Sequence, residues 1–137
     1  MFKKKKINPI CLGSANFGFD YGINKKKAIN KKDLKKLFNY VGKNNISFID
    51  TAINYKDSEK KIGLFNKYDF KIITKLPPIP KKIINIENWI INRIQDSCNR
   101  LKTNNLYGVL IHNTKELKKK ERSKKIYKAF DFLLKKK

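Results

Sequence analysis

Cysteine, proline, glycine and long apolar runs are all scarce in this chain of 137 residues. Its two cysteines, Cys11 and Cys98, form neither a disulfide framework nor a Cys-x-x-Cys metal or redox motif. No stretch approaches the ~18 consecutive apolar residues of a membrane-spanning helix. The basic start at residues 1–6 is not followed by an apolar signal core. We therefore expect a cytoplasmic protein with two unpaired thiols, no metal site and no membrane partner.

Acidic residues are also few, and 11 carboxylates against 34 basic side chains give a formal net charge of +23. Such a charge is typical of proteins that bind nucleic acid or anionic membranes. Only three basic residues are arginine, and Lys, Asn and Ile make up 66 of the 137 residues, as expected from an AT-biased genome. The lysine runs are scattered along the chain, whereas phosphate binding needs the charge on one face. We expect weak, non-specific binding and no specific nucleic-acid partner.

Apolar runs alternate with amphipathic stretches along the chain. The runs predict strands at residues 9–14, 46–50, 70–75 and 107–111. Helical spacing predicts helices at about 31–41, 57–65, 87–102 and 121–134, with a glycine-punctuated loop over 13–22. Asn30 is the expected N-cap of the first helix. This alternation indicates a parallel sheet with right-handed crossovers, so the predicted fold class is α/β in a single domain over residues 1–137.

Two α/β architectures begin in this way. A doubly wound sheet would carry a glycine-rich phosphate loop after its first strand. Gly13 and Gly18 have the outer spacing of such a loop, but Phe19 and Asp20 stand where Lys and Ser/Thr are required, and G-x-G-x-x-G is missing. The other architecture is the (β/α)8 barrel, whose active sites lie at the C-terminal ends of the strands.

Four polar residues stand at those strand ends. Asp50 and Lys75 each end a predicted strand, His112 directly follows one, and Tyr55 lies in the loop beyond Asp50. Each residue also has an ordinary structural explanation by itself. Lys75 is one of 31 lysines, and an aspartate such as Asp50 is common in turns. A single histidine beside a strand can be a packed core residue, and the Tyr55 ring can cover the barrel rim.

Together these residue types match acid–base chemistry on a carbonyl group. A tyrosine hydroxyl is a poor proton donor at neutral pH until a cation lies beside it. Lys75 can supply the cation, Asp50 can hold the ammonium, and His112 can orient a carbonyl oxygen against Tyr55. No side chain donates hydride, so this chemistry implies a nicotinamide cofactor.

The strings around these residues extend the pattern. Residues 12–18 read LGSANFG, and residues 50–59 read DTAINYKDSE, followed by Ile62-Gly63, Thr74-Lys75 and Leu110-Ile111-His112. They resemble the aldo-keto reductases, whose catalytic aspartate, tyrosine, lysine and histidine fall on Asp50, Tyr55, Lys75 and His112. The resemblance implies an enzyme that uses NADP(H), with NAD(H) as the alternative, to reduce aldehydes and ketones. One departure is Lys56, where the family usually has glycine.

The resemblance runs from about residue 8 to the end of the chain. It implies the first four β/α units of a (β/α)8 TIM barrel, a truncated half-barrel, because a closed barrel needs roughly 250 residues. Of the cofactor contacts, only those of Gly13, Ser14 and Asp50 carry over. A small-molecule carbonyl substrate is the expected ligand, and a homodimer or a complementing second half-barrel the expected assembly. The alternative is a catalytically inactive half-barrel that self-associates or serves as an interaction fragment, because four parallel strands leave two edges unpaired.

Overall fold

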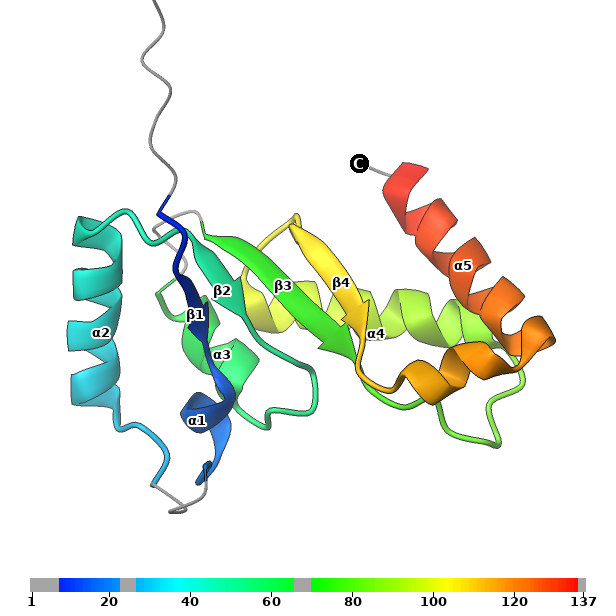
Figure 1. Cartoon of the computed structure of the whole chain (residues 1–137), viewed down its shortest axis with the longest axis horizontal. Helices are drawn as coiled ribbons and strands as arrows, with labels where there is room; N and C mark the ends of the chain where they lie inside the picture. The colour runs from blue at the N-terminus through cyan, green and yellow to red at the C-terminus, as the bar shows by residue number, and fades with distance from the viewer. Residues whose placement is uncertain (1–7, 23–26, 66–69, 136–137) are drawn as a thin grey trace, which may run out of the picture.

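A four-stranded parallel sheet organises the structure, a computed structural model that describes residues 8–22, 27–65 and 70–135 (Figure 1). The strands follow the chain order β1-β2-β3-β4, and every neighbouring pair is parallel. Their bounds are β1 (Cys11–Gly13), β2 (Phe48–Asp50), β3 (Lys71–Leu76) and β4 (Gly108–Ile111). The predicted α/β class, with strands and helices in alternation, is confirmed.

Helices connect the strands and pack beside them (Figure 1). The longer ones are α2 (Lys31–Lys43), α4 (Ile86–Leu101) and α5 (Lys120–Lys135), and α3 (Ser58–Gly63) is shorter than the predicted 57–65. Two short elements were not predicted, α1 (Ala15–Gly18) in the expected glycine loop and the 3-10 helix η2 (Thr114–Lys118). Within the part of the chain that the structure describes, no helix is long and apolar enough to cross a membrane.

Side-chain caps explain where the two clearest helices begin. Asn30 is the N-cap of α2, as predicted, and its side-chain oxygen accepts a hydrogen bond from the Asp33 backbone N–H at 2.9 Å. Asn85 caps α4 in the same way, through the Asn88 N–H at 2.9 Å. Each cap satisfies one of the backbone donors that a helix start leaves unpaired.

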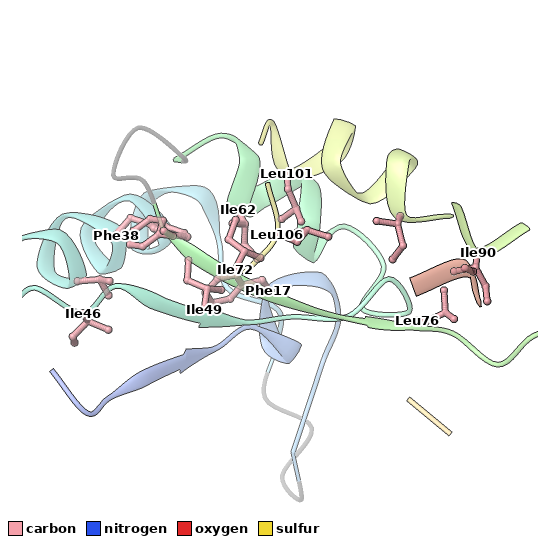
Figure 2. Packing of buried hydrophobic residues seen from close by; sticks show 14 of the residues in the cluster. Phe17, Phe38, Ile46, Ile49, Ile62, Ile72, Leu76, Ile90, Leu101 and Leu106 are labelled. Carbon is pink, nitrogen blue, oxygen red and sulfur yellow. The ribbon is translucent and has the colours of Figure 1, made fainter. Parts of the chain in front are cut away.

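One face of the sheet carries the hydrophobic core. Ile49 and Ile72 on neighbouring strands are fully buried and register partners, and they pack beneath Phe38 of α2 and Ile62 of α3. Figure 2 shows these side chains between the strands and the helices, with Leu101 of α4 in the same layer. The alternation along each strand therefore sends every second side chain toward the helices.

The last helix packs largely as its helical spacing predicts, with apolar residues at 126, 130, 133 and 134. Ile126 is fully buried, Phe130 and Leu133 are half-buried against the core, and Ala129 is the other fully buried residue of α5. Leu134, which the helical spacing placed on the core face, is 63% exposed. Leu134 directly follows Leu133, and one residue is about 100° of rotation around an α-helix, so Leu134 lies at the margin of the buried face.

The other face of the sheet has no helix over it among the described residues. Phe48, Asp50, Ile73 and Lys75 lie on this face, and Leu110 of β4, the register partner of Lys75, is also exposed there. The edges of β1 and β4 are both unpaired in the described sheet. We call this surface the uncovered face; in a closed (β/α)8 barrel it would be the interior wall.

A buried carboxylate joins three elements beneath the sheet. Glu59 of α3 is 1% exposed, and one of its oxygens accepts hydrogen bonds from the hydroxyls of Thr74 at 2.7 Å and Ser97 at 2.6 Å. Its other oxygen accepts from Arg100 Nε at 2.8 Å. A buried charge is tolerated only when it is paired and hydrogen-bonded in this way.

Replacing Glu59 by Gln should therefore destabilise the fold by about 3 kcal/mol, because Arg100 then loses its partner in a largely buried site. Urea unfolding followed by circular dichroism measures the loss. The matched control is Asp57→Asn, which breaks an exposed ion pair to Lys60 (3.6 Å) and should change stability by less than about 0.5 kcal/mol. Equal effects of the two variants would contradict the structural role of Glu59.

Candidate active site

The four residues predicted at the strand ends lie at the C-terminal end of the sheet, which the strand arrowheads mark in Figure 1. Asp50 is the last residue of β2, Lys75 the penultimate residue of β3, and His112 directly follows β4. Strand β3 thus runs one residue beyond its predicted end. The ladder continues past the strands, since the His112 N–H donates to the Leu76 carbonyl at 3.1 Å. Tyr55 lies in the loop between β2 and α3.

Lys75 and Asp50 form an ion pair across neighbouring strands. The Lys75 ammonium donates to Asp50 Oδ1 and also to the Thr51 carbonyl at 3.0 Å. The Lys75 side chain is 18% exposed and that of Asp50 36%, so the pair is partly shielded from solvent. Because both partners sit on rigid strands, the ammonium is held at a defined point on the uncovered face.

Tyr55 lies between this ammonium and the histidine. Lys75 Nζ is 5.5 Å from the centroid of the Tyr55 ring, within the range of a cation–π contact. The ring centroids of Tyr55 and His112 are 6.1 Å apart at an interplanar angle of 86°, an edge-to-face arrangement. The structure thus brings all four predicted residues together, with the Tyr55 ring close to both a cation and an imidazole.

A buried polar network, which the sequence reasoning missed, anchors the Tyr55 loop. The Ser58 hydroxyl lies 2.8 Å from the Ser14 hydroxyl and 3.2 Å from that of Thr51, and it donates to the Ser14 carbonyl at 3.0 Å. All three side chains are fully buried. Two members of this network, Thr51 and Ser58, belong to the 50–59 string, so a signal for it was present in the sequence.

Glycine is required where the first loop meets the Tyr55 loop. A Cβ placed on Gly18 would stand 1.8 Å from the Tyr55 carbonyl oxygen, far inside van der Waals contact. Gly18 therefore permits the close backbone approach that brings Phe19 beside Tyr55, with ring centroids 6.0 Å apart.

Lys56, the residue after Tyr55, has a strained backbone. Its φ of +46° lies in the left-handed region that lysine rarely adopts. A lysine thus stands, at this departure from the family's usual residue, in a backbone conformation that glycine adopts without strain.

The residues predicted to bind the cofactor differ in what they offer. Gly13 is open, since an added Cβ would meet nothing within 4 Å, and Asp50 lies on the uncovered face. Ser14 is 1% exposed, its hydroxyl is engaged with Ser58, and its backbone N–H donates to the Asp50 carbonyl at 3.0 Å, so it offers a ligand no free donor. Among the described residues no group of three or more His, Cys, Asp or Glu side chains could hold a metal ion.

Comparison with known proteins agrees with this geometry. The Aldo/keto reductase family model matches residues 9–137, and the chain belongs to that family. A crystal structure of PA4992 from Pseudomonas aeruginosa, named as a presumed aldo-keto reductase, is similar in fold with a TM-score of 0.63 at 22% identity. A second such structure from that organism gives a TM-score of 0.64 at 21% identity. No curated protein matches the chain.

The two solved structures also set the extent of the fold. Each similarity covers 88% of this chain but only 50% and 49% of the longer chains. The chain therefore spans about half the length of the structures it matches. The predicted half-barrel, four of the β/α units of a larger α/β barrel, is confirmed.

Substitution of Gly18 by Ala should push the Tyr55 loop away from the first loop. We expect a loss of about 1–3 kcal/mol, the cost of overpacking a tight contact, together with a shift of the His112 imidazole proton signal. Gly13→Ala is the control, since its Cβ meets no atom, and it should leave both readouts unchanged. The approach of the two loops would be wrong if the variants behaved alike in urea unfolding and NMR.

Cys11 reports on the charge of the site. Burial raises the pKa of the Cys11 thiol, and the negative charge of Asp50 raises it further, whereas the Lys75 charge lowers it. Removing the carboxylate charge in Asp50→Asn should therefore lower this pKa and increase the thiolate fraction near pH 8. Alkylation of Cys11 by iodoacetamide, followed by mass spectrometry, should become faster in Asp50→Asn and slower in Lys75→Met. Unchanged rates in both variants would count against this electrostatic coupling.

Proposed function

We propose that the site reduces carbonyl groups of aldehydes or ketones to alcohols, using NADP(H), with Tyr55 as the general acid. The observation that carries the proposal is the position of the Tyr55 ring, 5.5 Å from the Lys75 ammonium and 6.1 Å from the His112 ring. Membership of the aldo/keto reductase family supports the reaction class.

Each residue has a distinct part in the proposed reaction. A nicotinamide cofactor, when bound, would supply the hydride for the carbonyl carbon. His112 orients the carbonyl oxygen, and the Tyr55 hydroxyl transfers its proton to that oxygen as negative charge develops there. Lys75 stabilises the tyrosinate left behind, and Asp50 keeps the ammonium in place through their ion pair.

Activity requires the remainder of the barrel. Of the residues expected to contact a dinucleotide, only Gly13 and Asp50 are open to one in the described structure, because Ser14 is buried and hydrogen-bonded within the chain, and two residues are too few to hold the phosphates and adenine. We propose that a further four β/α units complete the barrel on the free edges of β1 and β4, supplied by a second copy, a separate chain or a longer gene product.

A second function is supported by the uncovered face. The exposed Leu110, with Phe48 and Ile73 on the same face, makes a partly apolar surface bounded by two open edges, which favours association. An inactive half-barrel that self-associates or binds another protein would use this surface. Sedimentation velocity combined with an NADPH titration distinguishes the two functions: association without dinucleotide binding favours the interaction fragment.

Replacing Tyr55 by Phe tests the reductase directly. The variant should lose about 100-fold or more of the NADPH-dependent reduction of an aromatic aldehyde, because the proton donor is gone while the ring remains. Tyr40→Phe, which alters an exposed ring on α2, is the matched control and should keep wild-type rates. Full activity of Tyr55→Phe would show that the assigned role is wrong.

Binding of NADPH should be measured before turnover. Titration followed by nicotinamide fluorescence in ~0.15 M salt separates specific binding from loose attraction of the phosphates to a protein with a net charge of +23. Saturable binding that persists at higher salt is the expected result if the site is completed. A folded chain that binds no NADPH would leave the interaction fragment as the function.

A further inference from the structure

Lys56 occupies a tight turn directly beside the proposed acid. The Ser58 N–H donates to the Tyr55 carbonyl at 2.9 Å, which closes a four-residue turn with Lys56 as its first central residue. A positive φ at this position is normally met by Gly, Asn or Asp. The chain contains 16 asparagines, so an unstrained side chain was available to this composition. Strain held next to a reacting group is a reason to look for a function of the side chain.

The Lys56 ammonium lies near an aromatic ring that also contacts Tyr55. Its Nζ lies 5.9 Å from the centroid of the Phe19 ring, and the same ring lies 6.0 Å from that of Tyr55. Phe19 also makes an edge contact with Tyr21 at 5.8 Å. One aromatic surface thus connects the proposed proton donor with a cation.

The carboxylates nearest to Lys56 in sequence or in the site are committed elsewhere. Asp57 pairs with Lys60 at 3.6 Å, Asp50 pairs with Lys75, and Asp20 accepts a hydrogen bond from the Ala28 N–H at 2.8 Å. Among the ion pairs of the described residues, none includes Lys56, and its side chain is exposed. Its charge is therefore available to a ligand.

We propose that Lys56 determines specificity, by binding the carboxylate of a substrate whose carbonyl group lies at Tyr55. The middle of such a substrate, an aryl or alkyl segment, would lie along the Phe19 ring. The identity of the reacting end rests on the proposed reductase function, whereas the carboxylate subsite depends only on Lys56 and Phe19. The substrate class is thus an aldehyde or ketone that also carries a carboxylate.

Binding of two product-like ligands tests the subsite without requiring catalysis. 4-(Hydroxymethyl)benzoate and the neutral 4-(hydroxymethyl)benzamide have nearly the same shape, and neither forms Schiff bases with lysine. His112 is the only histidine, so its imidazole proton signal reports binding at this site alone. Each ligand is titrated at ~0.15 M salt, where distant surface charges are largely screened.

The wild-type chain should bind the benzoate about fivefold more tightly than the benzamide, the upper range for an exposed ion pair. Lys56→Met keeps the apolar stem and should abolish the difference, as should Lys56→Asn, which also relieves the strained φ. The control Lys43→Met removes one charge at the C-terminal end of α2. This end lies near the start of β1, because the Asn8 side chain donates to the Asn44 carbonyl, whereas the site lies at the opposite ends of the strands. This control variant should retain the difference.

Equal affinities in the wild type, no response of His112 to either ligand, or an equal loss in Lys43→Met would each overturn the role of Lys56. The NADPH-dependent reduction of 4-carboxybenzaldehyde is measured on the same preparations. Lys56-dependent binding without any turnover would count against the reductase while leaving the carboxylate subsite intact.

Discussion

The carboxylate of Glu59 is the contact on which the geometry of the site depends. It is buried, and it joins α3 to β3 through Thr74 and to α4 through Ser97 and Arg100. Its neighbour Ser58 makes the hydrogen bonds that hold the start of α3 against the first loop. The loop that carries the proposed acid is therefore clamped at its C-terminal end by polar contacts in the core. A buried charge has few alternative partners, so this clamp specifies one arrangement.

The parallel sheet supplies the other half of the constraint. Because all strands run in one direction, their carboxyl ends meet at one edge, and Asp50 and Lys75 come into contact from adjacent strands. In the described structure, the same sheet has no helix over its uncovered face and no partner strand along the outer edges of β1 and β4. A (β/α)8 barrel resolves this problem by closing on itself, and this chain spans half of such a fold. All four candidate site residues, Asp50, Tyr55, Lys75 and His112, lie on this half.

Sequence reasoning succeeded where a local pattern has a single physical outcome. The alternation of apolar runs predicted four parallel strands, and the cap at Asn30 predicted the start of α2. It failed where tertiary packing chooses among local options. The four-residue α1 forms inside a loop because Phe17 is buried in the core, and Leu134 is exposed because it lies at the margin of the buried face of α5. The network around Ser58 was missed because a small polar residue near a helix start usually caps that helix.

Residue types and their order along the chain were decided by the sequence alone: α/β alternation, the 50–59 string and four polar residues at predicted strand ends. Proximity was decided only by the tertiary structure, because parallel pairing brings together positions that lie 25 residues apart, as in Asp50 and Lys75. The left-handed turn at Lys56 was likewise decided by tertiary contacts. The backbone preference of lysine for negative φ opposes this turn. The hydrogen bonds that hold the start of α3, together with the close approach at Gly18, overcome that preference.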